Sequence, residues 1–354
     1  MVAAVTISVK ATNLVSQIEI ETTASARLRE VYSPVASEMA DVEQILRTEL
    51  RSDYPCVDEL VRYGCLLGGK RLRPVVLLLA GKCAGELNKD HLTLSAVVEM
   101  IHTATLVHDD VLDEADTRRH LATINSRWDS KASVLLGDFL FTHAFYLAST
   151  LDSTWACRAI GRATNIVCEG ELRQKGSRGD FALDEAEYIE IIAAKTAELC
   201  ACSCQLGAHY AGAAPDIVDR FTRFGRDLGI AFQIADDVLD LAGDEKTIGK
   251  SLGTDLEQQK PTLPIIRTLQ IAPRQECEQL LAILHREAEH NDDDLLPLLK
   301  KHDAIEYSLD TARGFARRAA DEIRDLEPSP SLTTLIMITE FVVNRSMQES
   351  DLEP

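Results

Sequence analysis

The chain has 354 residues with 57 acidic and 37 basic side chains, which gives it a formal net charge of −20. This excess of carboxylates argues against nucleic acid as a partner and against a polybasic membrane anchor, because both need clustered Lys and Arg. An apolar fraction of 45% with only 5% aromatic residues favours a soluble globular protein and disfavours a β-sandwich or barrel.

Residues 1–35 are expected to form a poorly ordered N-terminal extension. Residues 1–25 are rich in Ser and Thr, but they contain a single basic residue, Lys10. They lack the charged start and apolar block of a signal peptide and the arginines of a typical mitochondrial leader. No apolar run has the length expected of a membrane span, so we expect a cytoplasmic protein, although the Ser and Thr content leaves an organellar leader open.

Helical patterns follow one another from residue 36 to about residue 347. Apolar residues recur three and four positions apart, as in Leu94, Val97, Val98 and Ile101. Breaks carry Gly or Pro, and Ala214-Pro215-Asp216 has the Pro and acidic residue of a helix start. Helices are predicted over 36–52, 56–66, 71–84, 91–114, 131–150, 153–175, 184–212, 215–242, 258–270, 273–289, 292–302, 304–325 and 330–346.

No convincing strand and no linker divides this pattern, so the sequence predicts one all-α domain over 36–347 with a tail over 348–354. Helices near 91–108 and 190–212 are apolar or small around most of their circumference, which is typical of the interior of a large bundle. Nine scattered Cys residues do not form a disulfide framework. Cys200, Cys202 and Cys204 point in too many directions around a helix to bind one ion, so we expect buried thiols in a reducing compartment.

The sequence Asp-Asp-Val-Leu-Asp occurs twice, at 109–113 and at 236–240. Each copy ends a mainly apolar helical run, and its first and last Asp lie about 40° apart on one helix face. Such carboxylates repel one another, and the end of a helix disfavours anions further. Mg²⁺ prefers carboxylate oxygens and completes its shell with water and phosphate oxygens. The repeat therefore predicts a magnesium site, with Asp109, Asp113, Asp236 and Asp240 as candidate ligands.

A solvated acidic surface and a calcium loop account for this repeat less well. A solvated surface would explain one copy in so acidic a chain, but two identical copies after apolar runs are hard to attribute to chance. A calcium-binding EF-hand needs Gly at its sixth position and Glu at its twelfth, and that spacing is missing. We therefore expect the two copies to serve one ligand.

Basic residues gather close to these carboxylates. The stretch 68–74 places three cations after a Gly pair, and glycine lets the backbone approach an anion that Lys and Arg then bind. The chain has to turn after Asp113 if Arg118 is to reach the same ligand as Asp109. Together, cations and carboxylates in this arrangement suit a diphosphate bridged by metal ions. The further cations in these stretches are Arg119, Lys195, Lys250 and Lys260.

In the order of its motifs the chain resembles the all-trans polyprenyl diphosphate synthases. The matching stretches are GGKRLRP at 68–74, EMIHTATLVHDDVLDEADTRR at 99–119, LLGDFLF at 135–141, EGE at 169–171, KTAEL at 195–199, FQIADDVLDL at 232–241 and GKSLGTDLEQQKPTLP at 249–264. The resemblance is strong over about 60–265, and residues 1–35 match no part of the pattern. It implies a single large helical bundle of the isoprenoid synthase type with a central apolar cavity.

The resemblance also implies a trans-prenyltransferase that condenses isopentenyl diphosphate with an allylic diphosphate in successive head-to-tail additions. Two or three Mg²⁺ ions per active site would bind Asp109, Asp113, Asp236 and Asp240. The allylic diphosphate would contact Arg118, Lys195, Thr196, Gln233 and Lys250, with Lys260 as a further binding residue. Isopentenyl diphosphate would contact Lys70, Arg73, His102 and Arg119. A buried packing histidine is the alternative for His102.

Product length is implied to depend on the cavity floor below the first Asp copy. Ala104 and Thr105 stand where bulky aromatic residues accompany short products in the family, and small residues would leave a tunnel open towards Ile101. Aromatic residues on a neighbouring helix are candidates either for the lower end of that tunnel or for ordinary core, namely Phe139, Phe141 and Phe145. We therefore expect a heptaprenyl to nonaprenyl diphosphate, for quinone side chains, and keep a farnesyl or geranylgeranyl diphosphate synthase as the alternative.

Two functions of different classes compete with this one. A terpene cyclase would share the bundle and the first Asp copy, but the second copy and GGKRLRP at 68–74 argue against it. A non-catalytic regulatory subunit should have lost aspartates or basic ligands, and all of them are present. The family suggests a homodimer, a soluble protein with a membrane-associated product and no nucleic-acid partner.

Overall fold

The computed structural model describes residues 32–66, 71–118, 121–242, 254–285 and 294–344, and every structural statement below concerns these ranges. Residues 1–31 of the predicted extension over 1–35 and the predicted tail over 348–354 lie outside them, whereas Ser33–Val35, at the end of that extension, form a helical turn with Val35 buried. The roles predicted for Lys70, Arg119 and Lys250 also lie outside the described ranges.

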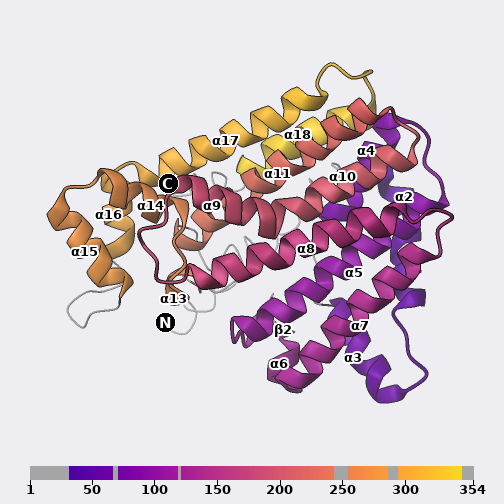
Figure 1. Ribbon diagram of the computed structural model, residues 1–354, viewed down its shortest axis with the longest axis horizontal. Helices are drawn as coiled ribbons and strands as arrows, with labels where there is room; N and C mark the ends of the chain where they lie inside the picture. Colours follow the sequence, from indigo (N-terminus) through magenta and orange to yellow (C-terminus); the bar gives the residue numbers. More distant parts are fainter. Residues whose placement is uncertain (1–31, 67–70, 119–120, 243–253, 286–293, 345–354) are drawn as a thin grey trace, which may run out of the picture.

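Helices form almost all of the described chain, as the sequence predicts (Figure 1). The elements are η1 (Ser33–Val35), α2 (Ala36–Glu49), α3 (Pro55–Leu66), α4 (Leu72–Ala84), α5 (Lys89–Leu112), β1 (Thr117–Arg118), β2 (Leu121–Ala122), α6 (Ile124–Arg127), α7 (Ser130–Ser149), α8 (Trp155–Gly176), α9 (Glu185–Ile192), η2 (Ala193–Ala197), α10 (Glu198–Tyr210), α11 (Pro215–Ala242), α13 (Thr254–Glu257), α14 (Leu263–Ile271), α15 (Arg274–Leu284), α16 (Leu295–Lys301), α17 (Ala304–Ile323) and α18 (Pro330–Asn344).

The helix starts have local causes in the sequence. Asn88, Asp129 and Asp184 cap α5, α7 and α9, and the side chain of each accepts a hydrogen bond from a backbone N–H of the first turn. Pro215 and Pro330 begin α11 and α18, where a missing N–H costs nothing because the first turn has no partner for it.

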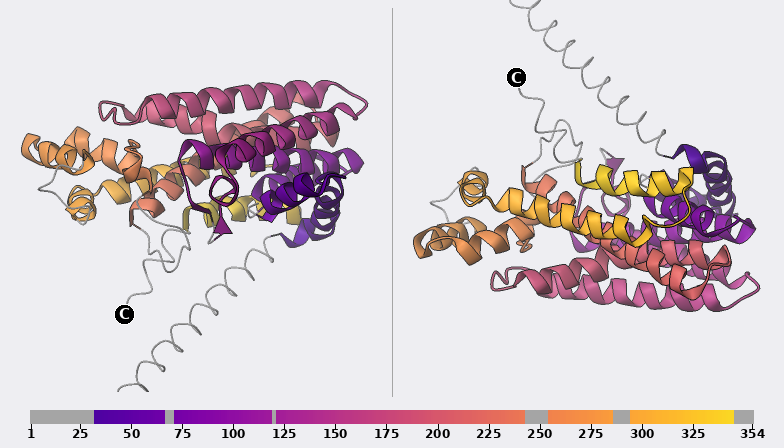
Figure 2. Two further views of the ribbon diagram at one scale, coloured as in Figure 1. Left: turned by 90° about the horizontal axis from the view of Figure 1, so that it is seen from below. Right: turned by 90° about the horizontal axis from the view of Figure 1, so that it is seen from above.

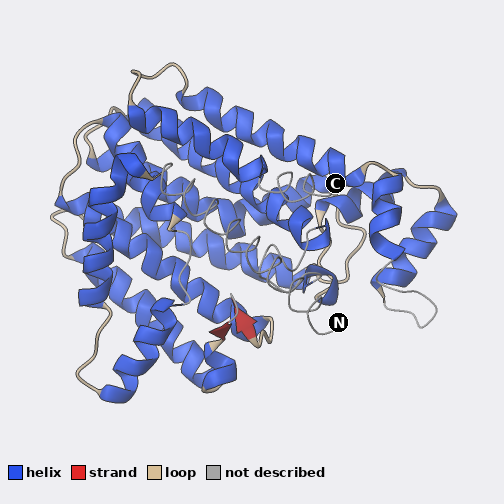
Figure 3. Ribbon diagram, turned by 180° about the vertical axis from the view of Figure 1, so that it is seen from behind, coloured by secondary structure: helices blue, strands red, loops and turns tan. Residues whose placement is uncertain are grey.

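Three features differ from the predicted helices. Strands β1 and β2 form a short antiparallel hairpin that pairs Arg118 with Leu121, where no strand is predicted (Figure 3). A π-helical turn, η2, divides the predicted helix 184–212. The predicted helix 258–270 begins only at Leu263, because Gln259 has a left-handed backbone with φ 51° and Pro261 cannot donate to a preceding turn.

The core is layered. Helix α10 contacts α8 on one side and α4 and α11 on the other, and α17 and α18 cover α11 and α4. Both views in Figure 2 accordingly show the pink α8 and the yellow α17 and α18 on opposite sides of the bundle. Small residues allow this close packing, since a Cβ at Gly207 of α10 would collide with the carbonyl oxygen of Leu77.

The thiols of α10 belong to this packing. Cys200, Cys202 and Cys204 are buried and free, and burial raises the pKa of Cys202 to about 12. This confirms the prediction of buried packing residues. Helices α5 and α10 are likewise buried over most of their residues, as predicted.

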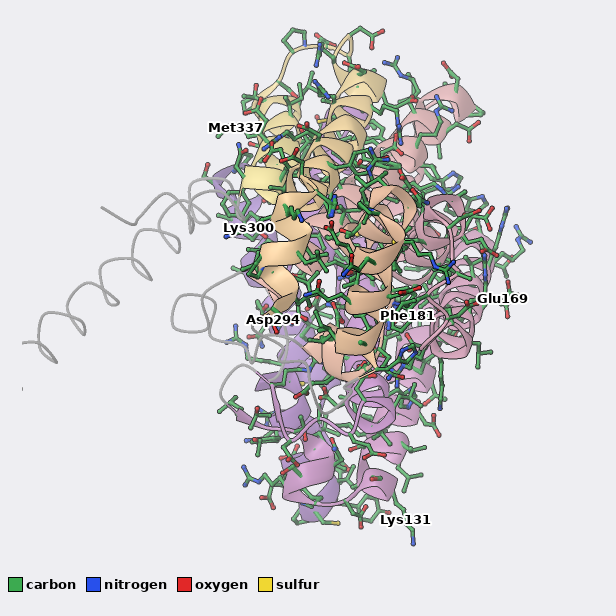
Figure 4. The ribbon with its side chains drawn as sticks, turned by 90° about the vertical axis from the view of Figure 1, so that its left-hand side faces the viewer. Lys131, Glu169, Phe181, Asp294, Lys300 and Met337 are labelled. Atoms are coloured by element: carbon green, nitrogen blue, oxygen red, sulfur yellow. The ribbon has the colours of Figure 1, made fainter. Side chains whose placement is uncertain are left out.

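A second, smaller apolar cluster joins α13 to α16 at one end of the bundle (Figure 1). Its buried side chains include Leu256, Ile265, Leu280 and Leu299, and Phe181 from the loop after α8 packs against them. Figure 4 shows Phe181 beside this group of helices. The cluster therefore holds the segment that follows the second Asp copy against the loop after α8.

Helix α7 is apolar enough, by length and composition, to cross a membrane, contrary to the expectation that no segment is. It packs along α5, and helices in protein cores have the same composition. Its outer face retains large exposed side chains, with Leu135 66% and Tyr146 61% exposed.

Candidate active site

The first Asp copy lies at the C-terminal end of α5. Asp113 caps this helix, and Glu114 turns the chain away with a left-handed backbone at φ 52°. The side chains of Asp109 and Asp113 are each 21% exposed. Burial raises the pKa of Asp109 to about 6; Lys195 opposes this shift, whereas nearby carboxylates add to it. Two carboxylates thus lie together at the rim of the core.

Lys195 approaches this copy from the π-helical turn η2. Its Nζ lies 3.9 Å from Oδ2 of Asp109, 2.5 Å from Oε2 of Glu171 and 2.8 Å from Oε1 of Gln174. The close approach of α8 requires Gly170, since a Cβ there would collide with the backbone N of Lys195. Lys195, which the resemblance predicts to contact the diphosphate, thus lies beside Asp109, whereas Glu171 and Gln174 were not predicted at the site, although EGE at 169–171 is one of the matching motifs.

Two further cations face Asp113 from other elements. Arg178, in the loop after α8, donates from Nη2 to Oδ1 of Asp113 at 2.5 Å. The Nζ of Lys260 lies 3.9 Å from Oδ2 of Asp113 and 3.2 Å from Oδ1 of Asp255. Burial acts to lower the pKa of Lys260, but the carboxylates of Asp255 and Asp113 outweigh it and raise the pKa. No sequence motif indicated Arg178.

Arg118 reaches a different carboxylate from the ones predicted as metal ligands. The chain does turn after Asp113, as expected, and the hairpin directs Arg118 back so that Nε and Nη2 lie 2.8 and 2.7 Å from Oδ1 of Asp110. Asp110 is 2% exposed, and its burial raises its pKa while Arg118 opposes that rise. The second Asp of the copy therefore anchors Arg118 at the edge of the site.

The second copy is organised around its own second carboxylate. Asp237 is buried and accepts hydrogen bonds from the hydroxyl of Tyr188 and from Nε2 of Gln233, both at 2.6 Å. The hydroxyl of Thr196 donates to Oε1 of Gln233 at 2.7 Å. Burial raises the pKa of Asp237 well above its ordinary range. Thr196 and Gln233, both predicted at this site, thus form one hydrogen-bonded chain that holds α11 against α9 and η2.

The two copies face each other through Lys260 and Asp255. Besides its contact with Lys260, Asp255 donates from its backbone N–H to Oδ2 of Asp240 at 2.9 Å. A cavity of about 70 Å³ lies beside this bridge. Cations and carboxylates share its wall, which includes Gln174, Tyr188, Lys195, Gln233, Asp237 and Lys260.

The predicted binding residues near the start of α4 lie in a different setting. Arg71 pairs with Glu43 of α2 at 2.7 Å and with Glu99 of α5 at 2.6 Å. Arg73 is half-buried, and its Nε has no partner among the described residues. His102 is half-buried on α5. The roles of Arg73 and His102 in binding isopentenyl diphosphate stay predictions.

The predicted chain-length residues lie on α5 below the first copy. Ala104 is fully buried and Ile101 is 1% exposed, whereas Thr105 is half-buried and donates to the carbonyl oxygen of His102 at 2.8 Å. Phe141 and Phe145 stack on each other along α7 and pack against the core. Small side chains therefore lie one turn below Asp109, and the length of the product stays a prediction.

The donor set fits a divalent cation. Asp109 and Asp113 offer oxygen ligands, and the cationic groups of Lys195, Arg178 and Lys260 lie within 3.9 Å of them. In the described ranges no three ligating side chains are gathered into a ready cluster. A magnesium site does not require such a cluster, since Mg²⁺ is commonly bound through one or two carboxylates together with water and substrate phosphate.

Comparison with known proteins agrees with this geometry. A sequence profile of the polyprenyl synthetase family matches residues 54–299. The chain is 35% identical to the octaprenyl diphosphate synthase of Haemophilus influenzae over 90% of this chain and 97% of that protein. It is also 35% identical to the heptaprenyl diphosphate synthase component 2 of Geobacillus stearothermophilus over 80% of this chain and 88% of that protein.

Solved structures give the same result for the fold. A polyprenyl synthase from Caulobacter crescentus, complexed with calcium and isoprenyl diphosphate, matches with a TM-score of 0.85 and 34% identity, covering 90% of this chain and 98% of that one. The profile match includes both Asp copies and most of the helices that surround them. The predicted all-α fold of the isoprenoid synthase type is thereby confirmed, and the chain belongs to the polyprenyl synthetase family of trans-prenyltransferases.

Proposed function

We propose that this trans-prenyltransferase condenses isopentenyl diphosphate with an allylic diphosphate in the presence of Mg²⁺ and makes a heptaprenyl to nonaprenyl diphosphate for quinone side chains. The observation that carries the proposal is the meeting of the two Asp copies through Lys260 and Asp255, with Lys195 beside Asp109. Carboxylates and cations in alternation suit a ligand that brings both metal ions and phosphate oxygens.

The basic and acidic residues of the site have different proposed roles. Lys195 and Lys260 can neutralise diphosphate oxygens as the allylic C–O bond breaks, and Asp109, Asp113 and Asp236 can hold metal ions. Bound Mg²⁺ would supply the further neutralisation that makes the diphosphate a good leaving group. The isopentenyl double bond then attacks the allylic carbon, and one proton is lost to restore an allylic product. A diphosphate oxygen is the proposed proton acceptor.

Exclusion of water is the second requirement, because water would capture the allylic cation. The helices that lead into both Asp copies can exclude water. Ala104, Val107, Ile234 and Ala235 are all at most 2% exposed. The apolar packing behind the charged rim is therefore the part of the fold that protects the reaction.

The long product is proposed from the small residues Ala104 and Thr105 on α5. A growing chain that passes them meets no aromatic side chain in the turn of α5 that precedes Asp109. Octaprenyl and heptaprenyl diphosphate synthases among the relatives favour the same length class. A farnesyl or geranylgeranyl product is the alternative.

A homodimer is proposed from exposed apolar side chains on α7 and α8. Leu135 and Tyr146 on α7 and Leu172 on α8 are each more than 60% exposed, and large apolar side chains gathered on a surface often mark an interface. The relative named a component of heptaprenyl diphosphate synthase suggests the alternative, a complex with a different subunit. Light scattering of the purified chain, which gives its mass in solution, distinguishes a dimer from a lone subunit.

The catalytic proposal is tested with the purified chain alone. Farnesyl diphosphate, labelled isopentenyl diphosphate and Mg²⁺ are incubated with the protein, and the labelled products are sized. Label in products of heptaprenyl to nonaprenyl length supports the proposal. Products that stop at farnesyl or geranylgeranyl length refute the chain length only, and the absence of extended product points to a subunit that needs a partner.

A further inference from the structure

Arg178 reaches the first Asp copy from the loop that follows α8. Its Nη2 donates to Oδ1 of Asp113 at 2.5 Å and to Oε1 of Gln258 at 3.1 Å. Both members of the ion pair are largely shielded, with 24% of the Arg178 side chain and 21% of the Asp113 side chain exposed. The guanidinium therefore occupies an oxygen that the proposed function assigns to a metal ion.

Arg178 differs from the other cations of the site in its remaining partners. Lys195 contacts Glu171 at 2.5 Å and Lys260 contacts Asp255 at 3.2 Å, so each has a carboxylate besides the Asp109 and Asp113 pair. Within the part of the chain that the structure describes, the only carboxylate that Arg178 contacts is that of Asp113, and its other side-chain partner is the neutral amide of Gln258. Asp113 is therefore the carboxylate that balances the positive charge of Arg178.

A metal ion bound to Asp113 and this guanidinium would compete for the same carboxylate. Mg²⁺ binds oxygen at roughly 2.0–2.1 Å, so an ion on Oδ1 of Asp113 would lie close to the guanidinium, which already uses one lone pair of that oxygen at 2.5 Å, and the two positive charges would repel each other. The loop is also anchored, because the N–H of Gly179 donates to the carbonyl oxygen of Gln259 at 2.9 Å and Phe181 packs on the α13–α16 cluster. Arg178 is therefore held close to Asp113 and competes as a tethered group.

We propose that Arg178 is an internal counter-ion of Asp113. It weakens the binding of divalent metal at Asp113 until an anionic ligand binds the guanidinium in place of that carboxylate. The inference rests on the proposed function, because it assumes that Asp113 binds metal. A diphosphate offers oxygens to both the metal and the guanidinium. A bound diphosphate therefore relieves the competition between Arg178 and the metal ion for Asp113. Metal and diphosphate should strengthen each other's binding more in the unaltered chain than in a variant without Arg178.

The test measures metal binding without turnover. Free Mn²⁺ is titrated by electron paramagnetic resonance against the full chain and against Arg178→Gln, first alone and then with inorganic pyrophosphate. We expect Arg178→Gln to bind Mn²⁺ alone on the order of tenfold more tightly, because one nearby like charge is removed. Pyrophosphate should raise the Mn²⁺ affinity of Arg178→Gln by a smaller factor than that of the unaltered chain.

Two variants control the measurement. Arg178→Lys keeps the charge and should stay close to the unaltered chain. Arg173→Gln removes an exposed cation near the same end of α8, paired with Glu190 at 2.9 Å and not with the Asp copies, and should change nothing. Equal or weaker Mn²⁺ binding by a folded Arg178→Gln overturns the inference. If no form of the chain binds Mn²⁺, the metal dependence itself is refuted, and the inference with it.

Discussion

At the scale of single residues, Asp109 is a carboxylate whose negative charge the neighbouring cations only partly balance. Its carboxylate is largely buried near Asp113 and Glu171, and the closest cation, Lys195, is 3.9 Å away. Burial and these neighbours raise its pKa to about 6 in the folded chain, above the ordinary value. Because the folded pKa is the raised one, the stability that Asp109 contributes is complete at low pH and is lost as the pH rises through about 6.

Asp109→Asn should therefore stabilise the metal-free protein at neutral pH and weaken its response to magnesium. We expect the melting temperature in EDTA at pH 7.5 to rise by about 2 °C, since a buried negative charge is removed, and to gain much less on addition of Mg²⁺. Differential scanning fluorimetry checks both. Asp138→Asn removes an exposed carboxylate from α7 and should do neither. A variant that keeps the full magnesium response would contradict the metal role of Asp109.

Tyr188 carries a second prediction at this scale. Its hydroxyl donates at 2.6 Å to Asp237, and the phenol is buried. Tyr188→Phe leaves a buried carboxylate oxygen without that donor, which should cost about 1–3 kcal/mol of stability and lower kcat by displacing the second copy. Urea denaturation and turnover measurements check this. Tyr307→Phe is the matched control, because the hydroxyl of Tyr307 donates to Glu185 in a more exposed position and its loss should cost little.

The spacing of Asp109 and Asp113 on one helix face was predictable from the sequence, and Lys195 was predicted, from the family resemblance, to bind the diphosphate at the same site. The partner of Arg118 could not be predicted in this way. The hairpin that returns Arg118 to Asp110 depends on a left-handed residue at Glu114, for which the sequence has no glycine as a signal. Arg178 was missed for the same reason, since its place depends on how a loop folds back.

At the scale of elements, Arg71 ties three helices together. It precedes α4 with a left-handed backbone at φ 55°, and its guanidinium contacts Glu43 of α2 and Glu99 of α5. Glu99 is 1% exposed, and its Oε2 has no partner among the described residues. The carboxylate of Glu99 therefore depends on Arg71, whereas that of Glu43 is 35% exposed and can be solvated.

This asymmetry predicts unequal costs for removing the members of the cluster. Arg71→Ala leaves a buried charge unpaired and should destabilise the protein by about 3–5 kcal/mol. Glu43→Ala removes a partner that water can replace and should cost less than about 1 kcal/mol. Equilibrium denaturation in urea measures both free energies of unfolding. Equal costs would show that α2, and not the buried pair, holds the start of α4.

Most helix positions followed from periodicity and from start signals such as Pro215. The exceptions have a physical basis. The π-helical turn η2 inserts one residue into a continuous apolar pattern, and nothing in the residue types of Ala193–Ala197 marks it. Its consequence is the position of Lys195, which lies in that turn beside Gly170 of α8 and 3.9 Å from Asp109.

At the scale of the whole molecule, we expect the length of the product to depend on the space enclosed behind the two Asp copies. The sequence predicts the fold well, because long apolar helices leave few ways to bury themselves, and the family shares that architecture. The path of a growing chain is harder to predict, because it depends on side chains from several helices and on how far they part. Thr105 is the best point to test it, being half-buried on α5 and one turn below Asp109.

Thr105→Phe should shorten the product. A phenyl group one turn below Asp109 would fill the space that the growing chain has to enter, while the first condensation, which occurs nearer to the carboxylates, should proceed at close to its usual rate. Overpacking would cost about 1–3 kcal/mol, which a domain of this size can sustain. Thr142→Phe, on the exposed face of α7, is the matched control and should leave product length unchanged.

Products are sized after incubation with farnesyl diphosphate and labelled isopentenyl diphosphate. An unaltered length distribution for Thr105→Phe would mean that the chain grows along another face of α5.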